Sequence, residues 1–498
     1  MFLWEGFADR ISADAAVALR LARHVLDTGT LLPADWYYGN GDFWILGPQL
    51  FALPFVAAWG VVPRALVFAN ALGLLVLFAA VLALGRATRA RWTTALIAAS
   101  LVGALYSHFQ REFVVVQLSY GLMAAKLMLT LAAAIAWLRS RSGNRRASLA
   151  LAAYAVLLGA WTAENPLRPL VYLVLPLGIA IALDAEARNR RAIVLCAATL
   201  LAIGAGWVAH RWLSSRLQMV PGLGAFHVAS AHDWLRHAGW LVAGTRHLYG
   251  GDALGAPPLP FVQTVLAVAR AASLPVIGFL VLCSRNAGTR MPLDVGALAL
   301  ALVAAVLVVG SPMVDPFGDR YLLPAWLLAL VGAVLAARAL PSWRPLALLL
   351  AVAFPLGGLL NAVGIERAGS ASDAAGLPQP PSLDAAIASI AASGSTRGFA
   401  THRYAGVVTV RSGAAIEACD LTLEPQLAPA RWLDAETCFD PARYTDGFFV
   451  LLAPDERDAA HANALASKIG TPNEVREAGG YAIWLYRSGS GALAWLAR

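Results

Sequence analysis

The chain has 498 residues, of which 59% are hydrophobic and only 14% are charged, and its mean hydropathy is +0.63. Soluble domains carry about a quarter charged residues, so this composition excludes an ordinary water-soluble globular protein. The formal net charge is +8. This excess does not indicate nucleic-acid binding, because the arginines lie at the edges of long apolar stretches, where membrane proteins place them.

The chain begins with a region, residues 1–65, that shows neither a signal peptide nor a spanning segment before residue 44. Residues 12–26 predict an amphipathic helix with Ser12 as its N-cap. Asp14 then lies in the first turn, where a carboxylate stabilises the positive end of the helix. The loop 35–44 is rich in polar and aromatic residues, which indicates either an aromatic belt at the membrane interface or a platform for sugar rings.

A proline-marked segment at 47–62 follows, and it is too short for a clear membrane span. It resembles an interfacial or re-entrant element. Ten longer apolar segments come next and predict an α-helical polytopic bundle over residues 66–364. They cover 66–85, 93–107, 113–138, 147–163, 169–183, 192–209, 262–283, 292–310, 321–338 and 345–363.

Arginine is concentrated in alternate gaps between these segments, for example at 86–91, 139–146 and 188–191. Cationic short loops stay in the cytoplasm during insertion, so the intervening acidic gaps should face outward. Ten spans would place residues 1–65 outside as well. Either segment 47–62 crosses the membrane, or a first transmembrane helix belongs upstream and is absent from this chain. We favour the second explanation, because of the resemblance given below.

Composition changes after the last apolar segment. Residues 365–382 form a linker rich in small residues and proline. Residues 383–498 predict a small α/β domain outside the membrane, with helices at 383–394 and 455–469 and strands at 397–401, 406–411, 415–423, 447–452 and 480–487. Cys419 and Cys438 fall in this domain. An oxidising compartment permits a disulfide between them, but sequence gives no geometry, so the pairing stays open.

Polar groups gather in the outward gaps and, rarely, inside a span. The gaps hold Arg111, Glu112, Glu164, Arg168 and Arg320, while Lys126 lies within a span. An ionisable group inside a bilayer is costly and marks a functional candidate, such as a ligand for a lipid phosphate. The alternative is that these acids and bases pair with one another at helix ends. The histidines of the gap 210–261 leave a zinc site open, but no pair of them has familiar zinc-ligand spacing, so none is assigned as a metal ligand.

The order of parts resembles the GT-C class of membrane glycosyltransferases, which includes protein mannosyltransferases and aminoarabinose transferases. Asp14 matches the acidic residue that these enzymes carry on an outward juxtamembrane helix. Pro48 and Pro54 mark the second juxtamembrane segment, and Arg64 precedes the span at 66–85. The stretch 319–324 (Asp-Arg-Tyr-Leu-Leu-Pro) also looks like late-helix sequence of bacterial members.

The resemblance implies transfer of a sugar from a polyprenyl-phosphate donor to an envelope glycan, lipid or protein on the periplasmic face of a bacterial inner membrane. Asp14 would be the general base, and Glu112 would bind a divalent metal or orient the acceptor. Cationic groups would stabilise the departing phosphate; the candidates are Arg20, Arg111, Arg168, Arg320 and Lys126. Candidates for contacting the sugar or acceptor are Trp36, Tyr37, Asp42 and Glu164.

Two other functions stay open. A transporter or flippase for an envelope lipid or glycan would have a similar composition, although we find no internal repeat of the kind that many transporters show. A non-catalytic scaffold derived from the GT-C fold would retain the bundle and lose the chemistry. The expected partners are membrane lipids, the lipid-linked donor and the acceptor, with no nucleic acid.

Overall fold

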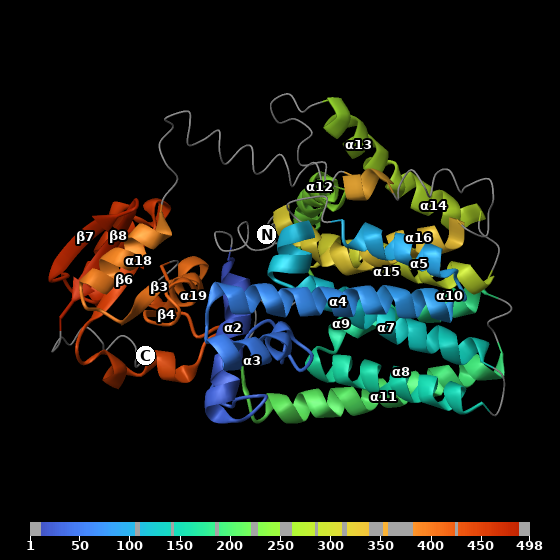
Figure 1. Cartoon of the computed structure of the whole chain (residues 1–498), viewed down its shortest axis with the longest axis horizontal. Helices are drawn as coiled ribbons and strands as arrows, with labels where there is room; N and C mark the ends of the chain where they lie inside the picture. The colour runs from blue at the N-terminus through green and yellow to red at the C-terminus, as the bar shows by residue number, and fades with distance from the viewer. Residues whose placement is uncertain are drawn as a thin grey trace. The chain divides into compact units, whose positions relative to one another are not determined.

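A computed structural model describes residues 11–104, 110–140, 144–184, 189–220, 228–249, 261–283, 287–310, 316–337, 352–356, 382–423 and 427–487. The chain divides into two compact units (Figure 1). The sheet unit comprises residues 1–71, 214–222 and 369–498, and the helical unit comprises residues 72–213 and 223–368. The predicted N-terminal region and C-terminal domain therefore fold together within the sheet unit.

In its described residues, the helical unit consists mainly of apolar α-helices, with two π-helical turns and one 3-10 turn. Its helices are α4 (Pro63–Ala87, which starts in the sheet unit), α5 (Trp92–Val102), α7 (Ser119–Arg139), α8 (Arg145–Glu164), α9 (Leu167–Pro169), α10 (Leu175–Leu183), α11 (Arg190–Ser214), α12 (Ala231–Leu248), α13 (Phe261–Ala271), α14 (Ser273–Cys283), α15 (Ala287–Val309) and α16 (Leu323–Ala337). The π-helical turns are Arg111–Val116 and Leu170–Val174, and the 3-10 turn is Pro316–Leu322.

Six segments of the described chain are helical, long enough and apolar enough to cross a membrane, which indicates a membrane protein. They are Pro63–Ala87, Ser119–Arg139, Arg145–Glu164, Arg190–Ser214, Arg290–Val309 and Gly318–Ala337. Each corresponds to one of the ten apolar segments in the sequence.

Of the other four predicted spans, two are short, one is divided into two helices, and one lies mostly outside the described residues. Helix α5 ends at Val102, and the segment Leu167–Leu183 is also shorter than a full span. The segment predicted at 262–283 is divided into α13 and α14. Of the segment at 345–363, only residues 352–356 are described.

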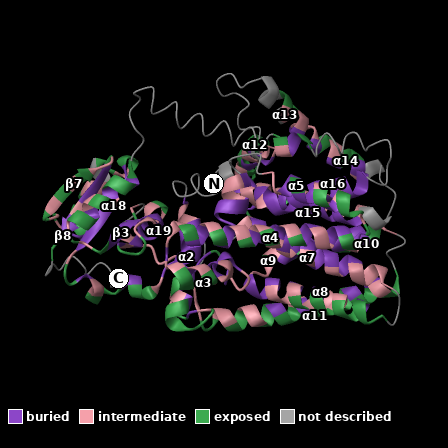
Figure 2. Cartoon of the chain, in the orientation of Figure 1, coloured by how far each residue is buried: buried purple, intermediate pink, exposed green. Residues whose placement is uncertain are grey.

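Helix α16 is the most buried of the six long helices and packs closely against α15. In the α16 span 89% of the residues are buried, compared with 22% in the α11 span, where Figure 2 shows many exposed residues. Small residues let α15 and α16 approach closely: a Cβ added to Gly296 would lie 2.7 Å from the backbone of Ala329. Close packing at small residues is the usual way in which helices associate inside lipid.

The sheet unit contains a six-stranded mixed sheet in the order β5-β4-β3-β6-β8-β7. Its strands are β3 (Arg397–Thr401), β4 (Glu417–Thr422), β5 (Ala428–Pro429), β6 (Phe448–Leu452), β7 (Glu474–Ala478) and β8 (Tyr481–Tyr486). Strand β3 pairs in parallel with both β4 and β6, and the remaining pairs are antiparallel. The three parallel strands therefore form the middle of the sheet.

Helices and short turns complete the sheet unit. The helices are α2 (Ala13–Thr28), α3 (Pro48–Trp59), α18 (Leu383–Ala392), α19 (His402–Arg411) and α20 (Ala459–Lys468), and the 3-10 turns are Glu436–Phe439, Pro441–Tyr444 and Pro454–Glu456. Two further short strands, β1 (Tyr37–Tyr38) and β2 (Gln218–Met219), pair in parallel. Helix α2 packs against both α3 and α19, which joins the N-terminal residues to the C-terminal sheet.

One prediction for the C-terminal domain is wrong, and one strand was missed. Residues 406–411 were expected to form a strand, because Val407, Val408 and Val410 have high strand propensity, but they form the second half of helix α19. Their burial against neighbouring elements outweighs that preference. Strand β7 was missed because its exposed edge position gives it charged residues instead of an apolar run.

Candidate functional site

Helix α2 carries the acidic residue singled out from the sequence, and local signals define its ends. The Ser12 side chain accepts a hydrogen bond from the Ala15 amide at 3.4 Å, and Gly29 ends the helix in the left-handed region, with φ of 67°. Glycine adopts that conformation without strain. Asp14 lies in the first turn, as predicted, and 48% of its side chain is exposed.

Asp14 contacts a histidine that the sequence analysis overlooked. His402 is the first residue of α19, directly after strand β3. Its Nδ1 lies 2.6 Å from Oδ2 of Asp420 on β4, and its Nε2 lies 3.4 Å from Oδ1 of Asp14. Asp420 is almost fully buried, whereas Asp14 is half exposed. The imidazole thus lies between an inner and an outer carboxylate.

This environment keeps His402 protonated. Burial lowers the pKa of His402, but hydrogen bonds to Asp14 and Asp420, together with their negative charges, raise it to about 10. Both ring nitrogens then donate, one to each carboxylate. His402 is therefore a cation at neutral pH and cannot itself accept a proton. Asp14 is the exposed member of the group, and a carboxylate there can accept a proton from a substrate.

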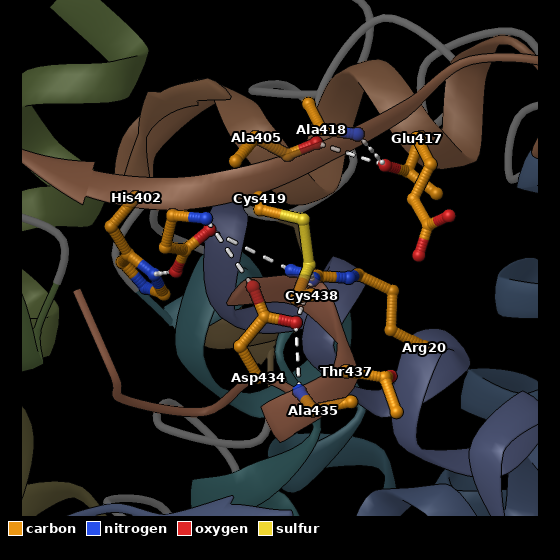
Figure 3. Close-up of polar contacts among 12 residues, drawn as sticks. Arg20, His402, Ala405, Glu417, Ala418, Cys419, Asp434, Ala435, Thr437 and Cys438 are labelled. Atoms are coloured by element: carbon orange, nitrogen blue, oxygen red, sulfur yellow. Dashed lines mark hydrogen bonds and ion pairs between the residues drawn. A yellow bond between two sulfur atoms is a disulfide. The ribbon is translucent and has the colours of Figure 1, made fainter. Parts of the chain in front are cut away.

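Arg20 joins the same network from two turns further along α2 (Figure 3). Its guanidinium donates a short hydrogen bond to Asp434 and lies 3.6 Å from a carboxylate oxygen of Asp420. Burial works against its charge, but the two carboxylates raise the pKa of Arg20 above its usual value, so the group stays charged. Burial also raises the pKa of Asp434, to about 6, against the lowering effect of Arg20.

These contacts correct the prediction that Arg20 binds the donor phosphate. Only 8% of its side chain is exposed, and its charge is already neutralised by two buried acids. A phosphate would have to displace a buried carboxylate from its cation, which is costly. Arg20 instead holds α2 against the segment that carries Asp434.

A disulfide fixes that segment. Cys419 and Cys438 are bonded, with their Cα atoms 5.8 Å apart, so the structure contains the pair that the sequence left open. Among the described residues, the one group arranged to hold a metal consists of these two cysteines and Asp434. The bonded sulfurs are not thiolates, and thiolate is the form that binds metal. The geometry therefore favours a covalent tie over a metal centre.

The aromatic loop after α2 lies within the sheet unit. Trp36 is only 2% exposed and its ring centroid is 5.7 Å from that of His24, so it is not an open platform for a sugar. The Tyr37 amide donates to the Asp434 carbonyl at 2.8 Å, and the Tyr37 ring makes an edge contact with Phe439. Asp42 is buried. Each of these three side chains thus makes packing contacts or is buried within the sheet unit, none offers an open ring face for stacking on a sugar, and the sequence-based assignment of sugar contacts stays a prediction.

The helical unit brings together two of the predicted phosphate ligands. Arg320 Nε donates to the Tyr120 hydroxyl at 3.2 Å, and its guanidinium lies 5.4 Å from the centre of the Tyr321 ring. Arg168 interacts electrostatically with Tyr120 and with Tyr172, whose hydroxyl donates to the Tyr321 carbonyl. The structure thus gathers two guanidinium groups and three tyrosines from α7, α9, the π-helical turn Leu170–Val174 and the 3-10 turn Pro316–Leu322.

The remaining candidates of the helical unit lie elsewhere or pair with one another. Lys126 Nζ donates to both carboxylate oxygens of Glu164 at 2.8 Å, and both side chains are largely buried. This pair matches the alternative that acids and bases in the bundle neutralise each other. Arg111 and Glu112 begin a π-helical turn, where Glu112 accepts a hydrogen bond from the Gln117 side chain at 3.3 Å.

A sequence signal for His402 did exist. In open sheets with parallel strands, ligands bind at the carboxyl ends of those strands. Residues 397–401 were predicted as a strand, and His402 is the residue that follows it. Asp420 lies near the end of the neighbouring predicted strand, and the sheet register pairs it with Ala400.

Comparisons of the chain with protein-family models, with curated proteins and with solved structures gave no match.

Proposed function

We propose that the chain is a membrane glycosyltransferase of the GT-C type, which transfers a sugar from a polyprenyl-phosphate donor to an envelope acceptor. The observation that carries this proposal is the half-exposed carboxylate of Asp14, held at 3.4 Å by the protonated imidazole of His402. A fixed, solvent-accessible carboxylate is the group that such a reaction requires as its base, and the proposal takes α2 to lie on the outward side of the membrane.

In the proposed reaction, an acceptor hydroxyl oxygen attacks the anomeric carbon of the sugar. The bond from that carbon to the donor phosphate oxygen breaks, and its electron pair leaves with the polyprenyl phosphate. Asp14 takes the hydroxyl proton. A cationic group is needed to stabilise the charge that develops on the departing phosphate, and within the helical unit taken by itself Arg168 and Arg320 are the proposed candidates. Their position beside aromatic rings suits a headgroup at the edge of a membrane.

A second candidate is the non-catalytic scaffold. It is favoured by the number of candidate groups that are occupied in buried ion pairs, namely Arg20 with Asp420 and Asp434, and Lys126 with Glu164. A scaffold predicts that Asp14 is dispensable, whereas a transferase predicts that it is required. The two functions therefore differ in a single substitution.

The test is a gene deletion followed by mass spectrometry of envelope glycans and lipids, with complementation by wild type, Asp14→Asn and Asp455→Asn. Asp455 is a matched control, because its side chain is 65% exposed and pairs with exposed Arg403 within the same unit. We expect wild type and Asp455→Asn to restore the missing product, and Asp14→Asn to fail although it reaches the membrane at the same level. Restoration by Asp14→Asn would refute its role as the base, and an unchanged profile in the deletion strain would refute transfer.

A further inference from the structure

The sheet unit contains a cleft that the proposed reaction does not use. Its volume is about 430 Å³, and it lies between α2, the residues that follow α3, the end of α19 and the segment 434–443. Neither Asp14 nor His402 lines it. The volume falls in the range of about 300–1,000 Å³ that is usual for small-molecule sites, which suits a ligand of about the size of a di- or trisaccharide.

Two ion pairs contribute most of the accessible charge in the cleft. Arg23 and Asp27 of α2 form one pair at 2.9 Å, and Arg443 and Glu417 form the other at 2.5 Å. All four side chains are partly exposed. The cleft therefore offers guanidinium donors and carboxylate acceptors in equal number.

This balance restricts the chemistry of the ligand. An anion would be attracted by the arginines but repelled by the two carboxylates. A cation would be attracted by the carboxylates but repelled by the arginines. A neutral ligand with many hydroxyl groups can donate to the carboxylates and accept from the guanidinium groups with no net electrostatic cost. Carbohydrates are the biological molecules with that pattern of groups.

The walls of the cleft also leave room and polar atoms for a ligand. Gly60 and Gly413 both lie at positive φ, and nothing lies within 4 Å of a Cβ added to Gly60, so backbone is exposed where other residues would place a side chain. Trp36 forms part of the lining, and its buried indole nitrogen has no hydrogen-bond partner among the described residues. A buried donor without a partner is costly, and a ligand hydroxyl or water would remove that cost.

We propose that this cleft binds a neutral oligosaccharide through the Arg23–Asp27 and Arg443–Glu417 pairs. The binding itself does not depend on catalysis. The assignment of the oligosaccharide as the acceptor chain of the transferase rests on the proposed function, and it would explain why a transferase carries a sheet unit at all.

The test measures binding of the full chain in nanodiscs to a panel of neutral oligosaccharides (chitotriose, mannotriose and maltotriose) and to the anionic trigalacturonate. Thr437→Trp places an indole in the cleft, since Thr437 is one of its exposed lining residues. Thr471→Trp is the matched control on an exposed loop outside it. Glu417→Gln removes one acceptor charge while keeping the shape.

We expect at least one neutral oligosaccharide to bind, with affinity at least about tenfold weaker in Thr437→Trp, moderately weaker in Glu417→Gln and unchanged in Thr471→Trp. Equal thermal unfolding of the two tryptophan variants shows that the loss is local. Binding of trigalacturonate alone, of none of the probes, or of a neutral probe equally well by Thr437→Trp would overturn the proposal.

The Asp14→Asn variant separates this proposal from the transferase proposal. If both hold, it binds the neutral oligosaccharide normally and makes no product. Binding without any effect of Asp14→Asn on the envelope would retain the cleft and remove the catalytic role.

Discussion

Replacing Arg20 by methionine would leave two buried carboxylates, Asp420 and Asp434, without their shared cation. Each of these acids exposes only 1% of its side chain. Removing one partner of a buried ion pair costs about 3–5 kcal/mol, because the remaining charge stays out of water. We therefore expect the opening free energy of the sheet unit to fall by about that amount.

The same helix supplies a matched control. Arg23 lies one turn from Arg20 and pairs with Asp27, but these side chains are 56% and 49% exposed. Exposed pairs of this spacing are worth about 0.5 kcal/mol or less. Arg23→Met should therefore be nearly neutral, which separates the effect of burial from that of losing an arginine.

The pH dependence of the Arg20→Met variant follows from Asp434. Burial already raises the pKa of Asp434 to about 6, and Arg20 opposes that rise. Without Arg20 the native pKa must increase further, so the carboxyl becomes neutral at mildly acidic pH. An acid with a raised native pKa destabilises the fold as pH rises through that value. The variant should lose less stability at pH 5 than at pH 8.

Hydrogen exchange of the β3 and β4 amides is the suitable assay, because it reports opening of one unit within a larger chain. We expect faster exchange in Arg20→Met than in wild type or Arg23→Met, with partial recovery in Arg20→Met/Asp434→Asn. Similar exchange in the Arg20 and Arg23 single variants would show that the buried network does not hold the unit together.

Three further predictions follow from other contacts. The native pKa of His402 is raised to about 10, so the stabilising effect of its charge should be complete below pH 6.5 and lost as pH rises through 10. The free energy of unfolding, measured from pH 6 to 10, should therefore decline in the wild type and decline less in His402→Asn. The size of that decline is bounded at about 5 kcal/mol and is reduced by solvent, since 28% of the side chain is exposed. Lys126→Met should lower the thermal stability of the helical unit by leaving Glu164 buried and unpaired, and Lys126→Met/Glu164→Met should recover much of it; an additive double variant would contradict the pairing. Gly406→Ala should destabilise the sheet unit by up to about 2 kcal/mol, because the added Cβ would lie 2.9 Å from Cβ of Ala16. Overpacking of that kind costs about 1–3 kcal/mol, and about 1 kcal/mol is recovered in helix propensity. Stability higher than that of the wild type would mean that α2 and α19 are free to separate.

Local sequence signals predicted the elements that depend mainly on local physics. The amphipathic pattern and the Ser12 cap located α2 to within two residues of its observed ends. Continuous apolar runs located the six long helices. Strand β3 was predicted at its observed residues, Arg397–Thr401.

The site itself could not be predicted in this way, because its contacts are not local. His402 and Asp14 are separated by 388 residues, and Arg20 and Asp434 by 414. Each of these side chains, taken alone, looks like an ordinary polar residue at a helix or strand end. The sequence analysis therefore predicted that Asp14 lies near an outward surface but predicted no partner for it. It predicted a phosphate as the partner of Arg20, where the structure has two carboxylates.

Helix α19 shows how tertiary packing decided both the fold and the site. Three valines in a helix cost a few tenths of a kcal/mol each relative to alanine. Val407, Val408 and Val410 are at most 6% exposed, and burying each one gains about 1.5–3 kcal/mol. Burial therefore outweighs strand propensity by several-fold.

Because this segment is helical, His402 becomes its first residue, at the carboxyl end of β3, where both ring nitrogens can reach a carboxylate. A strand at 406–411 would remove the helix that packs Gly406 against Ala16 of α2. The same packing that contradicted the strand prediction thus places the histidine beside Asp14.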